Sequence, residues 1–151
     1  MQKNHFVPIG GLTQSHFDDN GNIIKDATFK YLMIESSEGK LQMMLMLEGK
    51  PFTYHAEALL DHMKKNSIPE IKVNGGGKIY ISPSRKMIDV EGKSYAFGKS
   101  FRPEVFRFLN EIFPNFEIST DRMHTDPGGN NMNIAGVVLN FEKVKWEVDH
   151  P

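Results

Sequence analysis

The sequence predicts one α+β domain, in which two helices lie among five or six strands that pair mostly as hairpins. Two patterns lead to this fold class. Runs rich in β-branched and aromatic residues are separated by short turns, which is typical of hairpins, and two longer segments repeat apolar residues at helical spacing. A chain of 151 residues, 39% hydrophobic and 25% charged, is long enough for one soluble globular domain with its own core.

The N-terminal residues 1–27 are rich in turn formers and contain no apolar core of signal-peptide length. Asp18, Asn20 and Gly21 faintly resemble a calcium loop, but the other ligand positions and the closing glutamate are missing. We therefore interpret this segment as a plain turn. No stretch approaches about 18 uninterrupted apolar residues, so we expect no membrane-spanning helix and no membrane partner.

The next segments predict a hairpin and then a helix. Thr28–Ser36 and Leu41–Gly49 are β-rich and are separated by a turn at Ser37–Lys40. The period then changes to that of a helix over Thr53–Asn66, with Thr53 as its N-cap. The predicted apolar face of this helix consists of Ala56, Leu59, Leu60 and Met63.

The middle of the chain predicts a second hairpin beside a run of three glycines. Ile71–Val73 is a candidate short strand, and Lys78–Ser82 and Met87–Gly92 form a predicted hairpin. The glycines at 75–77 between them suggest a tight bend with positive φ. Residues 93–100 are loop-like.

The second predicted helix follows that loop, with Ser100 as its cap and Pro103 in its first turn. Its apolar stripe consists of Val105, Phe106, Leu109, Ile112 and Phe113. Asn115–Ser119 is a candidate last core strand, so the main domain is predicted to span residues 1–119. Residues 120–132 are polar and Asn133–Val148 is strand-like, so we interpret 120–151 as a C-terminal extension that forms an extra strand or hairpin arm.

Composition excludes several kinds of site. The net charge is −1 and no long basic run occurs, which argues against a nucleic-acid partner. The chain has no cysteine, so it has no disulfide, no thiolate nucleophile and no cysteine-based zinc site, and we expect it in the cytoplasm. None of its six histidines forms a zinc-binding pattern. We therefore expect no metal and no cofactor.

His55 is the histidine whose position suggests chemistry. It stands where a strand-like run meets the first turn of the predicted helix, and unpaired helix amides at such a place bind anions. A neutral histidine beside a phosphate can act as a base near pH 7. The alternative is a histidine that simply packs at a helix start, and its position alone does not decide between the two.

Two lysines and one loop have similar alternatives. Lys30 and Lys78 lie in half-buried strands and either face solvent or contribute positive charge to a site. The glycines lack the complete P-loop pattern that would bind a phosphate. Ser94–Gly98 is either an ordinary loop or a hydroxyl with consecutive backbone N–H groups that form an anion nest.

Five short pieces, taken together and in order, resemble the phosphohistidine phosphatase family, also called the Janus/Ocnus family. The pieces are "FKY", "YHAE", "NGGGKI", "SYAFG" and "FPNFEIS", and they cover roughly residues 28–119. The resemblance implies an α+β fold with a mixed sheet of about six strands and a helix packed on each side. It also implies a hydrolase, a protein phosphatase that is independent of metal and acts on phosphohistidine or phospholysine side chains.

The resemblance also assigns roles to individual residues. His55 matches the family's catalytic histidine, and Lys30 matches a substrate-binding lysine. Ser94, Tyr95 and Ala96 match the loop that holds the phosphate, and the helix amides, including that of Ala56, are expected to contribute to the same anion site. Lys78 stands where some members carry an arginine. Compared with arginine, the lysine keeps the positive charge but lacks the planar group that donates two parallel hydrogen bonds.

The expected reaction is hydrolysis of a P–N bond, with phosphohistidine proteins or peptides and the phosphate ion as ligands. His55 either takes a proton from water or attacks phosphorus, and the sequence does not separate these routes. The alternative function is a regulator that binds phosphoproteins in the same pocket without hydrolysis. A histidine at position 55 favours the enzyme.

Overall fold

The computed structural model describes residues 5–49, 52–94, 96–121, 132–133 and 136–150. Its helices are α1 (Gly11–Gln14), α2 (His55–Lys65), α3 (Arg102–Ile112) and α4 (Phe141–Asp149). Its strands are β1 (Phe6–Pro8), β2 (Ala27–Glu35), β3 (Leu41–Leu47), β4 (Glu70–Ser82), β5 (Met87–Glu91), β6 (Lys99–Ser100), β7 (Glu117–Thr120), β8 (Met132–Asn133) and β9 (Val137–Asn140).

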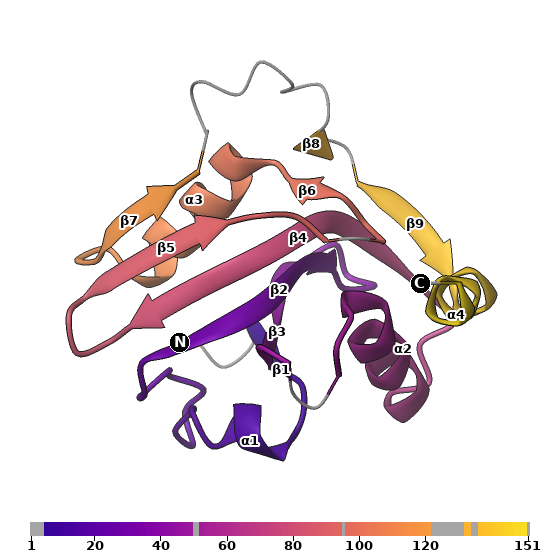
Figure 1. Ribbon diagram of the computed structural model, residues 1–151, viewed down its shortest axis with the longest axis horizontal. Coiled ribbons are helices and arrows are strands. Elements are labelled where there is room, and N and C mark those ends of the chain that lie inside the picture. The colour runs from indigo at the N-terminus through magenta and orange to yellow at the C-terminus, as the bar shows by residue number, and fades with distance from the viewer. Residues whose placement is uncertain (1–4, 50–51, 95, 122–131, 134–135, 151) are drawn as a thin grey trace.

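The strands form one mixed sheet around the long strand β4 (Figure 1). The main path runs β1-β3-β2-β4-β5-β7. The β2–β3 and β4–β5 hairpins are antiparallel, as the sequence predicts, whereas β1 joins β3 and β7 joins β5 in parallel. The short strand β6 and the C-terminal strand β9 also pair with β4.

The two faces of the sheet carry separate cores because side chains alternate along each strand. Along β2, Phe29, Tyr31 and Met33 point into the core beneath α3, whereas Leu32 and Ile34 point into the core beneath α2 and α4. α3 therefore lies on one side of the sheet, and α2 lies with α4 on the other (Figure 1). The predicted α+β class, with a mixed sheet and a helix on each side, is confirmed.

The three glycines lie inside one continuous strand, so the prediction of two short strands joined by a bend is wrong. β4 runs from Glu70 to Ser82, and its pairing with β2 shifts register opposite Leu32 and Ile34, which marks a β-bulge. Gly75 sits at this bulge with φ of 83°. A side chain on Gly76 would overlap the carbonyl oxygen of Tyr31. The glycines thus serve a bulge and close backbone contact within the sheet.

We expect Gly76→Ala to destabilise the fold by about 1–3 kcal/mol, because the added methyl group has no space against the β2 backbone. Urea denaturation of the variant and the wild type measures this loss. Gly11→Ala is the matched control, since nothing lies within 4 Å of the position of its added methyl group. Equal stability of the two variants would contradict the tight β2–β4 contact.

The helix caps differ from those predicted. α2 begins after Tyr54 and α3 begins after Phe101, so neither Thr53 nor Ser100 is an N-cap. In α2 the side chain of Glu57, the third residue of the helix, accepts hydrogen bonds from the N–H groups of Thr53 (3.2 Å) and Tyr54 (3.0 Å), which satisfies the donors just before the helix. Ser100 is instead fully buried in a polar network described below.

The C-terminal extension combines a strand with a helix. Among the described residues of the predicted strand-like stretch, Asn133 in β8 and Val137–Asn140 in β9 add to the sheet. Phe141–Asp149 form α4, so the strand prediction is wrong for these residues. The side chain of Asn140 accepts a hydrogen bond from the N–H of Lys143 (2.8 Å) and thereby starts the helix. The segment carries apolar residues at both strand and helix spacing, and this cap together with packing against α2 favours the helix.

Two further features complete the fold. The N–H groups of Asn20 and Asn22 each donate to Asp18 at 2.9 Å, which confirms the predicted turn. The strand β1, which the sequence did not predict, lies just before this region. Among the residues described, no helix is both long enough and apolar enough to cross a membrane.

Candidate active site

His55 is the first residue of α2 and lies over the glycine segment of β4. Its side chain is buried, with 8% of its surface exposed, and its Nε2 lies 3.1 Å from the carbonyl oxygen of Gly77. A carbonyl oxygen can only accept, so Nε2 carries the proton and Nδ1 keeps its lone pair. The strand therefore orients the ring and leaves one nitrogen able to accept a proton or attack an electrophile.

The surroundings of His55 favour the neutral ring. Burial lowers the pKa of His55 below its ordinary 6.5, and the positive charge of Lys30 acts in the same direction, against the opposing effect of the hydrogen bond to Gly77. The imidazole is therefore unprotonated at neutral pH, which is the state needed for a base or a nucleophile.

Lys30 and Lys78 are direct cross-strand neighbours on β2 and β4. Lys30 donates from Nζ to the carbonyl oxygen of Thr53, just before α2, while Lys78 lies 3.4 Å from a carboxylate oxygen of Glu48. Two like charges directly opposite each other are unfavourable in a sheet. Each lysine already has a partner: Lys78 keeps 48% of its side chain exposed and faces solvent, whereas Lys30 is half-buried. A doubly charged anion between them would offset the cost of the like charges.

The start of α2 provides backbone donors next to these charges. The N–H groups of His55 and Ala56 lie in the first helical turn, where helix geometry gives them no intrahelical acceptor. The positive end of the helix dipole points the same way. This arrangement suits an oxyanion or a phosphoryl group.

A small cavity of about 90 Å³ opens beside His55. Its walls are Tyr54, His55, Ala56, Glu57, Ala96, Glu147, Val148 and His150. Ala96 comes from the loop before β6, so the fold brings the predicted phosphate loop to the predicted catalytic histidine. The last three residues come from α4 and the residue that follows it.

Ser94 is close to this cavity in sequence but does not line it. Its side chain is buried, and its hydroxyl oxygen accepts a hydrogen bond from the N–H of Phe97 (3.2 Å). Backbone bonds between Ser94 and Gly98 close the loop at 2.9 and 3.1 Å. Ser94 thus shapes the loop that presents Ala96, whereas Tyr95, the remaining predicted loop residue, lies outside the described residues.

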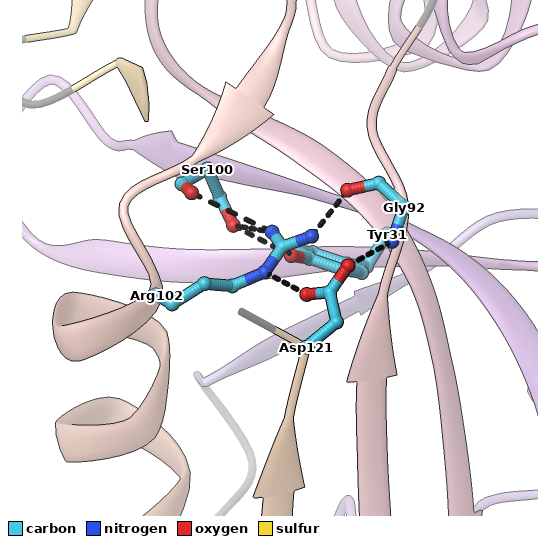
Figure 2. A network of polar contacts seen from close by, with 5 residues as sticks. All are labelled: Tyr31, Gly92, Ser100, Arg102 and Asp121. Atoms are coloured by element: carbon cyan, nitrogen blue, oxygen red, sulfur yellow. Dashed lines mark hydrogen bonds and ion pairs between the residues drawn. The ribbon is translucent and has the colours of Figure 1, made fainter. Parts of the chain in front are cut away.

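The buried Arg102 joins both ends of this loop (Figure 2). Its guanidinium donates to the carbonyl oxygen of Gly92 on one side and to the hydroxyl of Ser100 on the other, the latter at 2.6 Å. It also donates to Tyr31 Oη (2.8 Å) and to a carboxylate oxygen of Asp121 (2.7 Å). Burial raises the pKa of Tyr31 to about 12, so its hydroxyl remains neutral and able to accept.

A second hollow, larger and shallower at about 360 Å³, lies on the other side of Lys78. It is lined by Thr28, Lys78, Ile79, Tyr80, Asp89, Val90, Glu91, Ser119, Thr120 and Asp121, and does not include His55. Within the described part of the chain, no three histidine or acidic side chains are grouped so that they could hold a metal ion.

These observations define an α+β domain in which a neutral histidine and the start of α2 line a small cavity, and in which Lys30 binds the carbonyl oxygen of Thr53 just before that helix. Residues 19–117 match the model of the Janus/Ocnus family (Ocnus), which covers more than half of the chain. The chain belongs to the Janus/Ocnus family, which confirms the predicted family; the match does not test the phosphatase activity that the resemblance implied.

Similar curated proteins are named "Sex-regulated protein janus-A". The protein of Drosophila orena is 28% identical over 102 residues, 66% of this chain and 76% of the relative. The protein of Drosophila mauritiana is 30% identical over 101 residues, 64% of this chain and 74% of the relative. The name of these relatives states no chemical activity, so the reaction is a separate question.

Sequence reasoning missed the contribution of the C-terminal segment to this cavity. Glu147 and His150 lie beside His55, although they are more than 90 positions away in sequence. The available signals were Asn140 as a helix cap and the spacing of Phe141 and Val144, which fits a helix. Arg102 was also missed, because a single arginine at a helix start looks like a solvent-exposed residue.

Proposed function

We propose that this protein is a metal-independent protein phosphatase that hydrolyses phosphohistidine. The observation that carries the proposal is the unprotonated Nδ1 of the buried His55 at the start of α2, beside the opposed cations Lys30 and Lys78. Phospholysine carries the same P–N bond and is included in the substrate class. The cytoplasmic location expected from the sequence stays a prediction.

In the proposed reaction, the amides of α2 and the two lysines bind the phosphoryl oxygens and offset their charge. In the first route, His55 Nδ1 takes a proton from water, the oxygen attacks phosphorus and the P–N bond breaks, leaving phosphate and the substrate imidazole. In the second route, Nδ1 attacks phosphorus as the substrate P–N bond breaks, the substrate imidazole leaves after taking up a proton from water, and a second water later releases phosphate from His55. Both routes use the same lone pair, and both require that the ring be neutral.

The test is release of phosphate from a phosphohistidine peptide by the purified protein in the presence of EDTA. Turnover that persists with EDTA supports the proposal. The alternative function, a regulator that binds phosphoproteins without hydrolysis, predicts saturable binding of the same peptide and no release above the buffer rate. Absence of both binding and release would reject the two functions together.

We expect Lys30→Ala to weaken binding of inorganic phosphate by roughly ten-fold, since it removes one charged donor from the site. The effect should shrink as salt is added, because mobile ions screen charge. Lys64→Ala is the matched control, since Lys64 is exposed near the far end of the same helix that begins with His55. Calorimetric titration with phosphate measures the affinity of both variants. Equal phosphate affinities of Lys30→Ala and Lys64→Ala would show that Lys30 faces solvent and does not bind phosphate.

The rate should depend on pH through His55. Because burial lowers the pKa of His55 in the folded protein, the neutral ring persists to pH values below its ordinary 6.5. Turnover should therefore stay level from neutral pH into mildly acidic conditions and fall only as pH drops through the lowered pKa. A pH–rate profile of kcat/KM with a stable phosphopeptide, corrected for its uncatalysed hydrolysis, measures this. A fall that begins above 6.5 would contradict the neutral-ring assignment.

A further inference from the structure

We infer that α4 is an autoinhibitory cover, which closes the His55 cavity to phosphorylated proteins until it is displaced. The inference rests on the proposed function for the identity of the substrate, but its physical content is the position of α4. Figure 1 shows α4 beside α2, and the two helices are in contact.

The walls of the cavity show what α4 does. Three of its eight lining residues, Glu147, Val148 and His150, belong to α4 or directly follow it. With α4 in place the cavity measures about 90 Å³, well below the roughly 300–1,000 Å³ of sites that enclose a drug-sized ligand. Without these three residues, the cavity would become an open surface at the start of α2. The docked helix therefore keeps the phosphorylated side chain of a substrate protein out of the cavity beside His55.

The charge on α4 has the same effect. Glu147 lines the cavity beside the helix amides that suit an anion, and 20% of its side chain is exposed. Like charges in a partly buried site repel more strongly than in water. The ion pair with Lys143 at 3.5 Å offsets that charge only in part, because 51% of the Lys143 side chain is exposed to water. Glu147 thus disfavours phosphate while α4 is docked.

α4 is attached in a way that permits release. Val144 is its one fully buried side chain among the described residues, and it packs in the core cluster that includes Leu59 and Met63 of α2. Trp146 is 49% exposed, and Lys145 is also exposed. The strand β9, which precedes the helix, pairs with β4 independently of this contact. A segment held by few buried contacts opens more easily than the core does.

The experiment uses two full-length variants and one control. Val144→Asp undocks the helix, and Glu147→Gln removes the repulsion while the helix stays docked. Lys145→Ala changes an exposed residue of the same helix. Binding of inorganic phosphate, followed through the His55 ring signals by NMR, is compared with turnover of a phosphohistidine peptide.

We expect Val144→Asp to raise peptide turnover at least ten-fold and Glu147→Gln to tighten phosphate binding several-fold, while Lys145→Ala matches the wild type. The inference that α4 is an autoinhibitory cover would be rejected by either of two results. One is a folded Val144→Asp protein with unchanged or lower turnover, and the other is a Glu147→Gln protein with unchanged phosphate affinity. If no form hydrolyses the peptide, the proposed phosphatase function fails, and the phosphate affinities of the variants still decide the cover. If Val144→Asp does not fold, Glu147→Gln decides it.

Discussion

His55→Ala should lower turnover of a phosphohistidine peptide by at least about 10²-fold while the fold and phosphate binding survive. A general base contributes typically about 10²–10⁴-fold in rate, and loss of a nucleophile removes the route altogether. The fold should survive because the ring bonds only to the backbone, at Gly77 and Tyr31, among the contacts described, and sits at the first turn of α2 rather than in the centre of a core. Phosphate binding should survive because the amides and the lysines remain.

The control for this prediction is His62→Ala, on the same helix. His62 is partly buried, its ring contacts Asn66, and it does not line the cavity. Its replacement should leave turnover unchanged, which separates the chemistry of His55 from a general effect on α2. Near-normal turnover in a folded His55→Ala protein would reject the catalytic role and favour the regulator that binds without hydrolysis.

Much of the site could be predicted because its parts are short and local. The change from strand to helix spacing near residue 54 placed His55 at a helix start. Alternation along β2 left Lys30 either facing solvent or adding charge to a site, and only the family resemblance assigned it to the site. The register that sets Lys30 opposite Lys78 is a pairing between segments 48 positions apart, so no local pattern reveals it. The same applies to the glycines, whose role depends on the backbone of β2.

The C-terminal segment was predicted least well for a related reason. Its apolar residues fit a strand and a helix equally, and the choice depends on the cap at Asn140 and on a core site for Val144 against α2. A residue that completes a site from a distant segment leaves no local signal. Glu147 was missed for this reason, and because the sequence predicted a strand where α4 forms.

Arg102→Met should destabilise the protein by about 3–5 kcal/mol, the usual cost of removing one partner of a buried ion pair. Arg102 is fully buried, and its guanidinium donates to Asp121, Tyr31 and Ser100. Methionine fills much of the same volume but leaves these acceptors without their donor. Urea denaturation followed by circular dichroism measures the loss. Because the network joins both ends of the loop that carries Ala96, phosphate binding should weaken in the same variant.

Arg107→Met is the control, since Arg107 is exposed on the same helix and its replacement should change stability by less than about 0.5 kcal/mol. Equal losses for the two arginines would show that the network contributes nothing to stability.

The stabilisation from the Arg102–Asp121 ion pair should also disappear in acid. Burial raises the pKa of Asp121, but the bonds from Arg102 and from the N–H of Gly92 outweigh it and leave that pKa lowered. The stabilisation is therefore complete above the ordinary value of 3.8 and is lost as pH falls through the lowered pKa.

A chain that ends at Ser119 lacks Asp121, so we expect it to lose the same ion pair and to fold poorly, despite the boundary that the sequence suggested there.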